Sequence, residues 1–268
     1  MRTLQEPALK NLFDLTGKVA VITGGAGLLG KEFAAGFASF GAKVCVAEID
    51  EKRREAASEE LKRRGVDVRT APLDIADENS IERCLEKVIG SYGAVDVWVN
   101  NAYPTTQDWD LDFESIPASS WRENIDRHLN GYCFCCQKVG AQMKKQKKGS
   151  LINIASIHGI LGPDFSVYRN TSMTAPAAYS VIKGGIVNFT RYLASYYGPY
   201  GVRVNTISPG GIPNHSPEPF VKNYSEKTPL RRMGRPNDVV GAAIYLASDA
   251  SAYVTGHNLV VDGGWSVV

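Results

Sequence analysis

A tyrosine and a lysine four residues apart, in Tyr179-Ser-Val-Ile-Lys183, could carry out proton transfer. On a helix this spacing places both side chains on one face, one turn apart. The positive charge of the lysine favours the tyrosinate, so the phenol would ionise below its ordinary pKa of ~10. Such a phenol can donate and accept a proton near neutral pH. The pair alone is also a common pattern of surface helices, so the rest of the chain must decide.

A glycine-rich segment near the N-terminus has the pattern of a dinucleotide-binding turn. The β-rich run Lys18-Val-Ala-Val-Ile-Thr23 precedes it, and a helical pattern follows through Phe40. Gly25, Gly27 and Gly30 fit the spacing G-x-G-x-x-G. Glycines there permit a tight turn and let the backbone approach a pyrophosphate at the positive end of the helix. In this context the match predicts a dinucleotide site, and the alternative is a turn whose glycines serve packing only.

An acidic residue follows the next predicted strand, Lys43 to Ala47. Glu48 lies 18 residues beyond the last glycine of the turn. A carboxylate at this point can accept hydrogen bonds from both adenosine ribose hydroxyls and would repel a 2′-phosphate, which favours NAD over NADP. Arg53 and Arg54 come close behind and could favour NADP. We interpret them as solvated positions on a predicted helix at 51–64.

Strands and helices alternate along the rest of the chain. Further strands are predicted at 66–72, 95–99, 150–155, 202–208 and 258–261, and further helices at 77–92, 121–145, 179–197 and 237–248. Repeated βα units without a linker predict one α/β domain, a doubly wound parallel sheet of about seven strands with helices on both faces. We expect this Rossmann-type domain at 17–268, after a peripheral N-terminal arm at 1–16.

Composition and charge argue against several classes of partner. The 268 residues are 44% hydrophobic and carry a net charge of +2, so nothing suggests binding to nucleic acid or a membrane surface. No run of 18 apolar residues occurs, and residues 1–10 lack the apolar centre of a signal peptide. Five cysteines, including Cys133, Cys135 and Cys136, form neither metal-ligand pairs nor an even disulfide framework. They predict buried thiols in a reducing cytoplasm and no metal site.

Five motifs stand in the order found in the short-chain dehydrogenases/reductases, a family that the chain resembles from about Leu15 to Gly264. The motifs are Thr23-Gly24 with the glycine turn, Asn100-Asn-Ala102, Ser156 after the fifth strand, Tyr179 with Lys183, and Ser208-Pro-Gly210. The glycine spacing is more typical of the extended branch of this family. The Asn-Asn-Ala motif and the short C-terminus resemble the small single-domain branch, which we therefore expect.

The resemblance implies a role for each matched residue. Tyr179 would exchange a proton with the substrate oxygen while a hydride moves to or from the nicotinamide. Lys183 would lower the tyrosine pKa and hydrogen-bond the nicotinamide ribose, and Ser156 would donate a hydrogen bond to the reacting oxygen. The implied cofactor-binding residues are Gly24, Gly25, Gly27, Leu28, Leu29, Gly30, Glu48, Asp74, Ile75, Asn101, Ala102, Tyr179, Lys183, Pro209, Gly210 and Ile212.

Four positions depart from the family pattern, one of them Asn214 where the family commonly has a threonine. Leu28 and Tyr103 each replace a glycine, and His128 aligns with the active-site asparagine that holds a water in the proton relay. A histidine could relay protons itself, titrating near its ordinary pKa of ~6.5. It could equally be a helix histidine bonded to a backbone carbonyl. The sequence leaves both interpretations of this candidate catalytic residue open.

The segment between the catalytic serine and tyrosine is longer than is usual in the family. Ser156 and Tyr179 are 23 residues apart, and the polar residues between them include His158 and Asp164. Loops of this length are usually functional or disordered, so we expect a lid for a polyol. Together with Asn-Ala-Tyr-Pro-Thr-Thr at 101–106, it resembles flagellin modification protein A and related surface-polysaccharide oxidoreductases, which act in amino-sugar pathways.

A second variable region at 213–235 is basic and contains Pro217 and Pro219, which we expect to break it up. Two interpretations are open. Arg231 and Arg232 could recognise an anionic sugar, phosphate or nucleotide, or the region could be a solvated helical flap.

These observations together predict an NAD(H)-dependent oxidoreductase that interconverts a secondary alcohol and a ketone on a sugar or amino-sugar derivative. One alternative is a reductase of another small or lipid-like carbonyl compound. Another is a catalytically weak dinucleotide-binding assembly protein, which the intact Ser156, Tyr179 and Lys183 argue against. The resemblance also implies a cytoplasmic homotetramer built from the predicted helices at 121–145 and 179–197 and the C-terminal strand.

Overall fold

The computed structural model describes residues 11–268, which contain one parallel sheet of seven strands. The strands are β1 (Val19–Thr23), β2 (Lys43–Glu48), β3 (Val68–Pro72), β4 (Val97–Asn100), β5 (Gly149–Ile154), β6 (Val202–Pro209) and β7 (Asn258–Val261). Their order in the sheet is β3-β2-β1-β4-β5-β6-β7. The order reverses between β1 and β4, and ligands of such sheets bind outside the carboxyl ends of the strands at this point.

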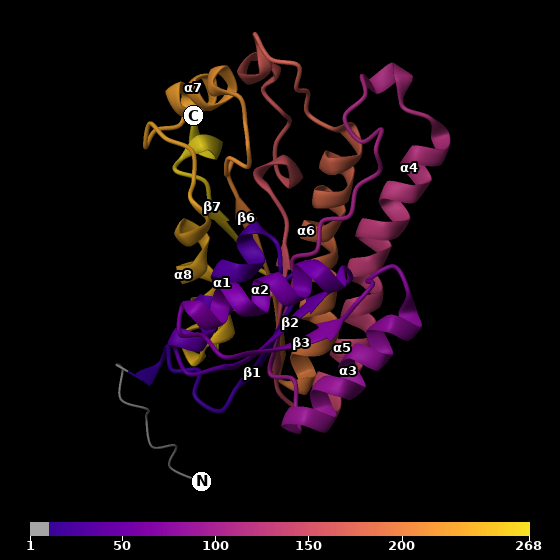
Figure 1. Ribbon diagram of the computed structural model, residues 1–268, viewed down its shortest axis with the longest axis vertical. Helices are drawn as coiled ribbons and strands as arrows, with labels where there is room; N and C mark the ends of the chain where they lie inside the picture. Colours follow the sequence, from indigo (N-terminus) through magenta and orange to yellow (C-terminus); the bar gives the residue numbers. More distant parts are fainter. Residues whose placement is uncertain (1–10) are drawn as a thin grey trace.

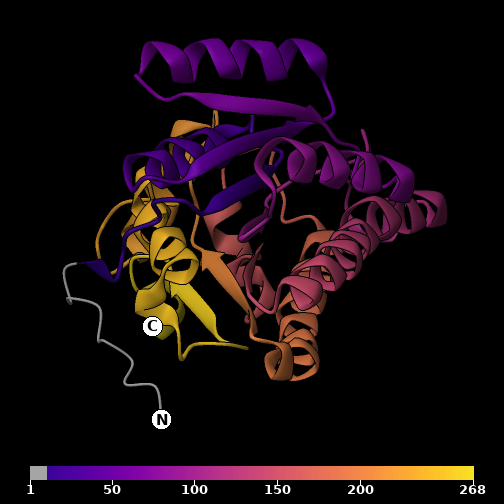
Figure 2. The same cartoon turned by 90° about the horizontal axis from the view of Figure 1, so that it is seen from below.

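Helices cover both faces of the sheet (Figures 1 and 2). One face carries α1 (Leu28–Ser39), α2 (Glu51–Arg63) and α8 (Val240–Ala247), and the other carries α3 (Glu78–Tyr92), α5 (Gly131–Gln146) and α6 (Ala177–Tyr197). In addition, α4 (Ala118–Asn124) leads into α5, and α7 (Glu218–Lys227) lies beyond the carboxyl ends of the strands. The predicted fold class is confirmed.

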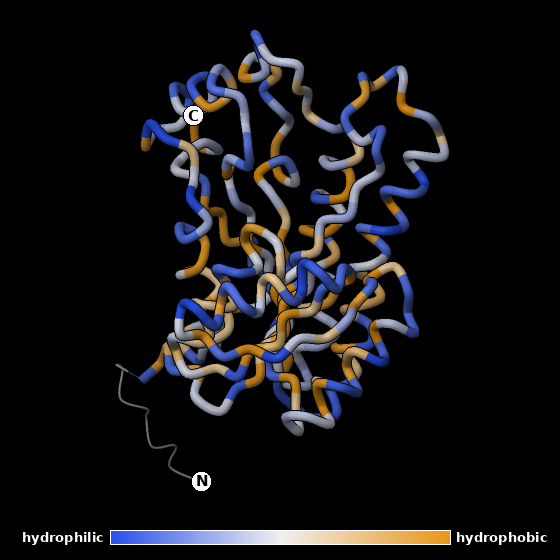
Figure 3. Tube along the Cα trace, viewed as in Figure 1, coloured by the Kyte–Doolittle hydropathy of each residue, from blue (hydrophilic) through white to orange (hydrophobic). Residues whose placement is uncertain are grey.

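The strands are apolar on both sides because each side is covered by helices. Along β1, Val21 packs on the side of α3, α5 and α6, whereas Ile22 packs on the side of α1 and α8. Trp98 in β4 and Phe33 in α1 are fully buried members of these two clusters. Figure 3 shows the hydrophobic residues concentrated along the central strands. Burial of this apolar surface is what holds the carboxyl ends of the strands in register.

Three predicted elements differ from the structure. The helix predicted at 121–145 begins at Ala118, and a π-helical turn (Ile125–Asn130) separates α4 from α5. The helix predicted at 237–248 begins as a 3₁₀ turn (Pro236–Val239) before α8. The region at 213–235 contains α7, with prolines just before and within its first turn. A proline there lacks only an N–H that the helix leaves unpaired, so these prolines begin the helix instead of breaking it.

The predicted N-terminal arm lies partly outside the described residues, which begin at position 11. Its remaining part packs on the domain: Leu15 is buried, and the carbonyl of Leu12 accepts a hydrogen bond from the N–H of Ala250. Within residues 11–268, no helix is long and apolar enough to cross a membrane. The same residues contain no group of three His, Cys, Asp or Glu side chains placed to hold a metal ion.

Candidate active site

Three predicted catalytic residues meet at the carboxyl end of β5. Ser156 lies two residues after the end of β5, and its hydroxyl accepts a hydrogen bond from the N–H of His158 at 3.2 Å. Tyr179 lies in the first turn of α6 and hydrogen-bonds with Ser156. Lys183 lies one turn later and donates a hydrogen bond to the carbonyl of Ile154 in β5 at 2.8 Å. The structure therefore brings the predicted serine, tyrosine and lysine together.

The electrostatics of the tyrosine differ from the expectation. Burial raises the pKa of Tyr179 above its ordinary value, and the hydrogen bond with Ser156 acts in the opposite direction. The amine of Lys183 lies 5.5 Å from the centroid of the tyrosine ring. Burial also lowers the pKa of Lys183 to about 7, so near neutral pH this group carries only part of a charge. Burial of both groups thus outweighs the predicted effect of the lysine on the tyrosine pKa.

His128 lies next to Lys183, a candidate catalytic residue. Its Nε2 is 3.2 Å from the amine of Lys183, and its Nδ1 has no hydrogen-bond partner among the residues that the structure describes. The side chain is fully buried, and this burial, together with the charge of Lys183, lowers the pKa of His128 well below its ordinary value. Neither ring nitrogen bonds a backbone carbonyl within residues 11–268, so the interpretation as a carbonyl-bonded helix histidine is wrong.

Aromatic side chains surround the phenol of Tyr179. The rings of Tyr103, Trp109 and His158 lie edge-on to it, with centroid distances of 5.6, 6.2 and 5.9 Å. The sequence analysis noted Tyr103 as a departure from the family pattern and His158 as a polar residue of the long segment, but it missed Trp109, which comes from the segment between β4 and α4. Tyr and Trp offer flat apolar surfaces with one polar atom each. The wall of the site is therefore aromatic on one side.

The glycine-rich turn packs closely against the end of β4. Gly24 has a positive φ of 59°, and a Cβ atom there would lie 2.8 Å from the Cα of Ala102. At Gly30 a Cβ would lie 2.5 Å from the carbonyl oxygen of Gly24. The N–H groups of Asn101 and Ala102 both donate to the hydroxyl of Thr23, at 2.9 and 3.0 Å. Only glycine fits these two positions, so both serve the packing of the turn, and the approach of a pyrophosphate to this turn stays a prediction.

The start of α1 offers free backbone donors. Gly27 precedes the helix, no side chain caps its N-terminus, and the first turn contains no acidic residue. Leu28, which replaces a glycine of the family pattern, is exposed. The unpaired N–H groups and the positive end of the helix dipole can therefore receive a pyrophosphate. This end of the sheet fits the dinucleotide that the turn predicts.

Glu48 lies buried at the end of β2, next to two arginines. Its Oε1 accepts a hydrogen bond from the N–H of Ile49 at 3.0 Å, and its Oε2 is 3.9 Å from the exposed guanidinium of Arg53. Arg54 donates to the backbone carbonyl of Glu48 at 3.1 Å and is largely buried. The interpretation of Arg54 as solvated is therefore wrong, and both arginines gather at the candidate ribose site.

The other predicted cofactor residues also lie near the carboxyl ends of the strands. They are Asp74 and Ile75 after β3, Gly25 and Leu29 around the start of α1, and Pro209, Gly210 and Ile212 at and after the end of β6. Asp74 is engaged locally, because its Oδ1 accepts a hydrogen bond from the N–H of Ala76 at 2.9 Å. Asn100, which the family pattern places on the adenosine side, is instead fully buried and bonds the side chains of Trp98 and Asn153. Its role is to hold β4 to β5.

The segment at 157–178 and α7 form one cover beyond the strands, and they lie together in Figure 1. Asp164 pairs with Lys227 across them. The side-chain amide of Asn223 donates to the carbonyl of Val167 at 3.2 Å. Apolar contact adds to these bonds, since residues of both parts belong to one buried cluster. We call this unit the cover.

The cover is anchored to the end of β6 and to the C-terminus. The hydroxyl of Tyr224 accepts a hydrogen bond from the N–H of Gly211 at 2.6 Å. The ring of Trp265 stacks on Tyr224 with centroids 4.1 Å apart. The two arginines of the flap are engaged within the chain: Arg231 bonds the carbonyl of Glu226, and Arg232 pairs with Asp238 at 2.5 Å. These bonds favour the helical flap over anion recognition.

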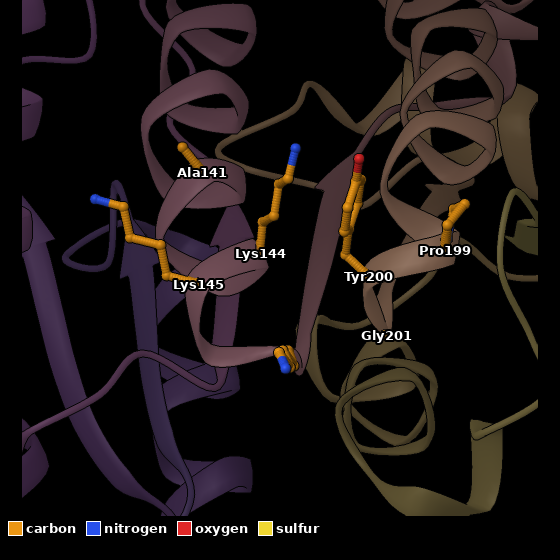
Figure 4. Close-up of a pocket in the computed structure, with 7 residues that line it drawn as sticks. Ala141, Lys144, Lys145, Pro199, Tyr200 and Gly201 are labelled. Carbon is orange, nitrogen blue, oxygen red and sulfur yellow. The ribbon is translucent and has the colours of Figure 1, made fainter.

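A separate surface hollow lies at the opposite end of α6 (Figure 4). Lys144 and Tyr200 form its sides, with the lysine amine 3.9 Å from the centroid of the tyrosine ring. Because α6 has 21 residues, this end is roughly 30 Å from Tyr179. No predicted site residue lines the hollow, so it is distinct from the candidate active site.

Comparison with known proteins agrees with this geometry. Residues 25–266 match the family described as enoyl-(acyl carrier protein) reductase. The chain is 33% identical to the sorbose reductase of Candida albicans, covering 96% of this chain and 89% of the relative. It is 30% identical to the post-translational flagellin modification protein A of Campylobacter coli, covering 94% of this chain and all of the relative.

A solved structure extends the agreement to three dimensions. A gluconate 5-dehydrogenase from Burkholderia cenocepacia, solved in complex with NADP and tartrate, superposes with a TM-score of 0.86. The two chains are 26% identical, and the alignment covers 96% of this chain and 98% of the other. From the matched residues, the fold and the assembled serine, tyrosine and lysine, this chain belongs to the short-chain dehydrogenases/reductases and is an oxidoreductase acting on CH–OH groups.

Proposed function

We propose that this protein interconverts a secondary alcohol and a ketone of a sugar or amino-sugar derivative, with NAD(H) as the hydride carrier. The observation that carries the proposal is the meeting of Ser156, Tyr179 and Lys183 beside a dinucleotide turn and beneath a partly polar cover. Two of the similar proteins are named for sorbose and gluconate, which supports a polyol substrate.

Each catalytic side chain has a distinct task. In alcohol oxidation, the tyrosinate form of Tyr179 takes the proton of the substrate hydroxyl, and in ketone reduction the phenol returns it. The hydroxyl of Ser156 donates a hydrogen bond to the same oxygen and stabilises the charge that develops on it. The charge of Lys183 stabilises the tyrosinate. The dinucleotide, when bound, accepts or supplies the hydride.

The surroundings of Tyr179 suit a substrate with both polar and apolar faces. The C–H groups of a sugar ring can pack against Tyr103 and Trp109, while its hydroxyl groups can bond the imidazole of His158. Burial lowers the pKa of His158, so this ring is neutral at pH 7 and has one donor and one acceptor. A purely lipid-like carbonyl compound would leave these polar atoms unpaired, which disfavours that alternative.

Turnover of simple polyols tests this proposal. Mannitol and gluconate are offered with NAD and NADP at pH 8 to 10, sorbose is offered with NADH and NADPH at pH 7, and the formation or consumption of NADH or NADPH is followed by absorbance. We expect at least one polyol to be oxidised, and Tyr179→Phe to lower the rate by about 10²-fold or more. The same variant should retain NADH binding, which shows that it is folded. Full activity of Tyr179→Phe would contradict the assigned role.

The choice of NAD rests on the carboxylate of Glu48, while Arg53 is the observation that favours NADP instead. Fluorescence titrations with NADH and NADPH separate the two possibilities. We expect the wild type to bind NADH more tightly, and Glu48→Ala to lose this preference. Preference of the wild type for NADPH, abolished by Arg53→Ala, would assign the 2′-phosphate to Arg53. Binding of neither dinucleotide would overturn the oxidoreductase proposal itself.

We also propose a cytoplasmic homotetramer. All five cysteines are free, which suits a reducing compartment. The outer face of α6 exposes Val181, Tyr192 and Tyr196, and the rings of the two tyrosines stack on each other. Such a row of exposed large side chains on one helix suits burial against a second copy of the chain.

A further inference from the structure

We propose that His128 positions the catalytic lysine: its neutral imidazole accepts, through Nε2, a hydrogen bond from the ammonium of Lys183 and thereby keeps the charge on that lysine. The catalytic consequence rests on the proposed function, because the charge of Lys183 matters through Tyr179. The hydrogen bond itself is a property of the ligand-free protein and can be measured without a substrate.

The contacts of Lys183 show why an acceptor is needed. The side chain is only 2% exposed, and a buried ammonium is costly unless its N–H groups are bonded. The carbonyl of Ile154 accepts one N–H at 2.8 Å, and Nε2 of His128 lies 3.2 Å away as the second partner. An ammonium has three donors, so one remains for the catalytic side of the site. The imidazole is thus one of the two protein groups that accept a hydrogen bond from this ammonium.

The proposed direction of this bond requires one protonation state of the histidine, because the geometry alone allows either nitrogen to donate. An Nε2 that accepts a hydrogen bond carries a lone pair, so the ring proton must lie on Nδ1. A protonated His128 would instead direct an N–H donor and a second positive charge at Lys183. The Nδ1 atom has no hydrogen-bond partner within the described residues, so no acceptor there stabilises an imidazolium. Any positive charge on the pair therefore lies on Lys183.

The other groups around His128 leave this assignment unchanged. Tyr132 on its own helix and Tyr103 from the segment after β4 face the ring with centroid distances of 5.2 and 5.4 Å. Burial raises the pKa of both phenols, so both stay neutral over the range in which the histidine could titrate. Among the described residues, Lys183 is the one charged group that acts on the imidazole from α6, the helix packed against it.

The backbone explains how this histidine reaches the lysine. His128 lies inside the π-helical turn, where the backbone is wider than in an α-helix and the side-chain directions are shifted. Single π-helical turns inside α-helices occur frequently at functional sites. The turn directs His128 to the buried lysine, whereas Asn130 in the same turn bonds the exposed Asp126.

Nitrogen-15 NMR of the ligand-free, full-length protein tests the protonation state. Long-range ¹H–¹⁵N spectra resolve the ring nitrogens of the four histidines, and the signals lost in His128→Asn identify His128. We expect a neutral ring protonated on Nδ1 from pH 5.5 to 8. An imidazolium at pH 7, or a ring protonated on Nε2, would overturn the proposal.

Titration of Lys183 tests the positioning role. Carbon-13 labelling of the lysine Cε follows its charge, and Lys183→Met identifies the signal. We expect His128→Leu, which removes the acceptor, to lower the titration midpoint of Lys183 by about 1 pH unit or more, and His128→Asn, whose amide oxygen can accept, to restore most of it. The control Asn130→Ala should leave the midpoint unchanged.

An unchanged midpoint in His128→Leu would overturn the proposal, as would an equal shift in His128→Leu and His128→Asn. If His128→Leu does not fold, the tautomer of the wild-type histidine decides the question alone. Failure to oxidise any polyol would contradict the proposed function and leave these measurements unaffected, so the two failures are distinguishable.

Discussion

At the scale of single residues, the most costly feature of the site is the buried lysine. Lys183 has two protein hydrogen-bond partners and almost no contact with solvent, and burial lowers its pKa to about 7. Burial disfavours the charged form of such a group in the folded protein. The group therefore lowers the free energy of unfolding at every pH at which the unfolded chain binds the proton. Active sites commonly retain such costs because the function needs the group.

This cost gives a prediction for stability against pH. The folded-state pKa of Lys183, about 7, lies below the ordinary value of 10.5, so the unfolded chain binds more protons between these two values. The free energy of unfolding of the wild type should therefore contain a contribution that rises with pH from about 7 to 10. This contribution should be absent in Lys183→Met. Urea unfolding at pH 7, 8, 9 and 10 measures the slope, with the exposed Lys222→Met as control. Equal slopes in wild type and Lys183→Met would contradict the burial argument.

Ser156 gives a second prediction at this scale. Its hydroxyl follows β5 and hydrogen-bonds with the phenol of Tyr179, where it can also reach the reacting oxygen. Loss of one such donor typically costs about 10²-fold to 10³-fold in kcat. We expect this loss in Ser156→Ala, with little change in cofactor affinity. The control Ser172→Ala, at an exposed position of the cover, should retain the wild-type kcat. Equal kcat values in the wild type, Ser156→Ala and Ser172→Ala would contradict the role of Ser156.

The catalytic residues could be predicted because their spacing is local and their order is distinctive. Tyr179 and Lys183 share one helix, and Ser156 follows a recognisable strand. The contact of His128 with Lys183 could not be predicted, because it depends on a π-helical turn that no periodicity in the sequence indicates. Trp109 was missed for a similar reason, since its place beside Tyr179 is set by the path of an irregular segment.

At the scale of elements, we expect the cover to determine access to the candidate catalytic residues. It combines the 157–178 segment with α7 through one ion pair, the bonds of Asn223 and shared apolar contacts. An exposed ion pair contributes little, typically 0–1 kcal/mol. The two hydrogen bonds from Asn223 to the carbonyls of Val167 and Arg169 are therefore the better target for substitution.

Asn223→Ala should loosen the cover. Removing two hydrogen bonds costs about 1 kcal/mol each, so we expect KM for the polyol substrate to rise by about 5-fold to 30-fold. The kcat should change less, because Ser156, Tyr179 and Lys183 stay in place. Lys222→Met, on the same helix but exposed, is the matched control. Unaltered KM in Asn223→Ala would show that the cover does not close over the substrate.

The strands and most helices could be predicted to within a few residues, whereas for α7 only a helical flap somewhere in 213–235 could be predicted, without its bounds. Apolar strands such as β1 are evident because helices cover both of their faces. The prolines around α7 obscured where this helix begins, because a proline can end or begin a helix depending on its position. The bonds of Asn223 to the cover are long-range contacts, which local patterns do not specify.

At the scale of the whole molecule, the exposed face of α6 gives a prediction about assembly. Glutamates at positions 192 and 196 would place two charges in an interface made of tyrosine rings. We expect light scattering after size exclusion to give the mass of a tetramer for the wild type and a smaller mass for the double substitution Tyr192→Glu with Tyr196→Glu. Tyr253→Glu, at a fully exposed position elsewhere, is the control. A monomeric wild type would contradict the proposed tetramer.

The stack of Trp265 on Tyr224 has a practical consequence for how the protein is handled in the laboratory. Trp265 lies three residues from the last residue, Val268, and Tyr224 holds the backbone just after β6. An affinity tag fused to this terminus would disturb the stacking of Trp265 on Tyr224 and so the backbone that Tyr224 holds after β6. Residues 11–16 pack instead where α1 ends, on the side of the amino ends of the strands. Purification tags and surface-attachment sites for this enzyme therefore belong at the N-terminus.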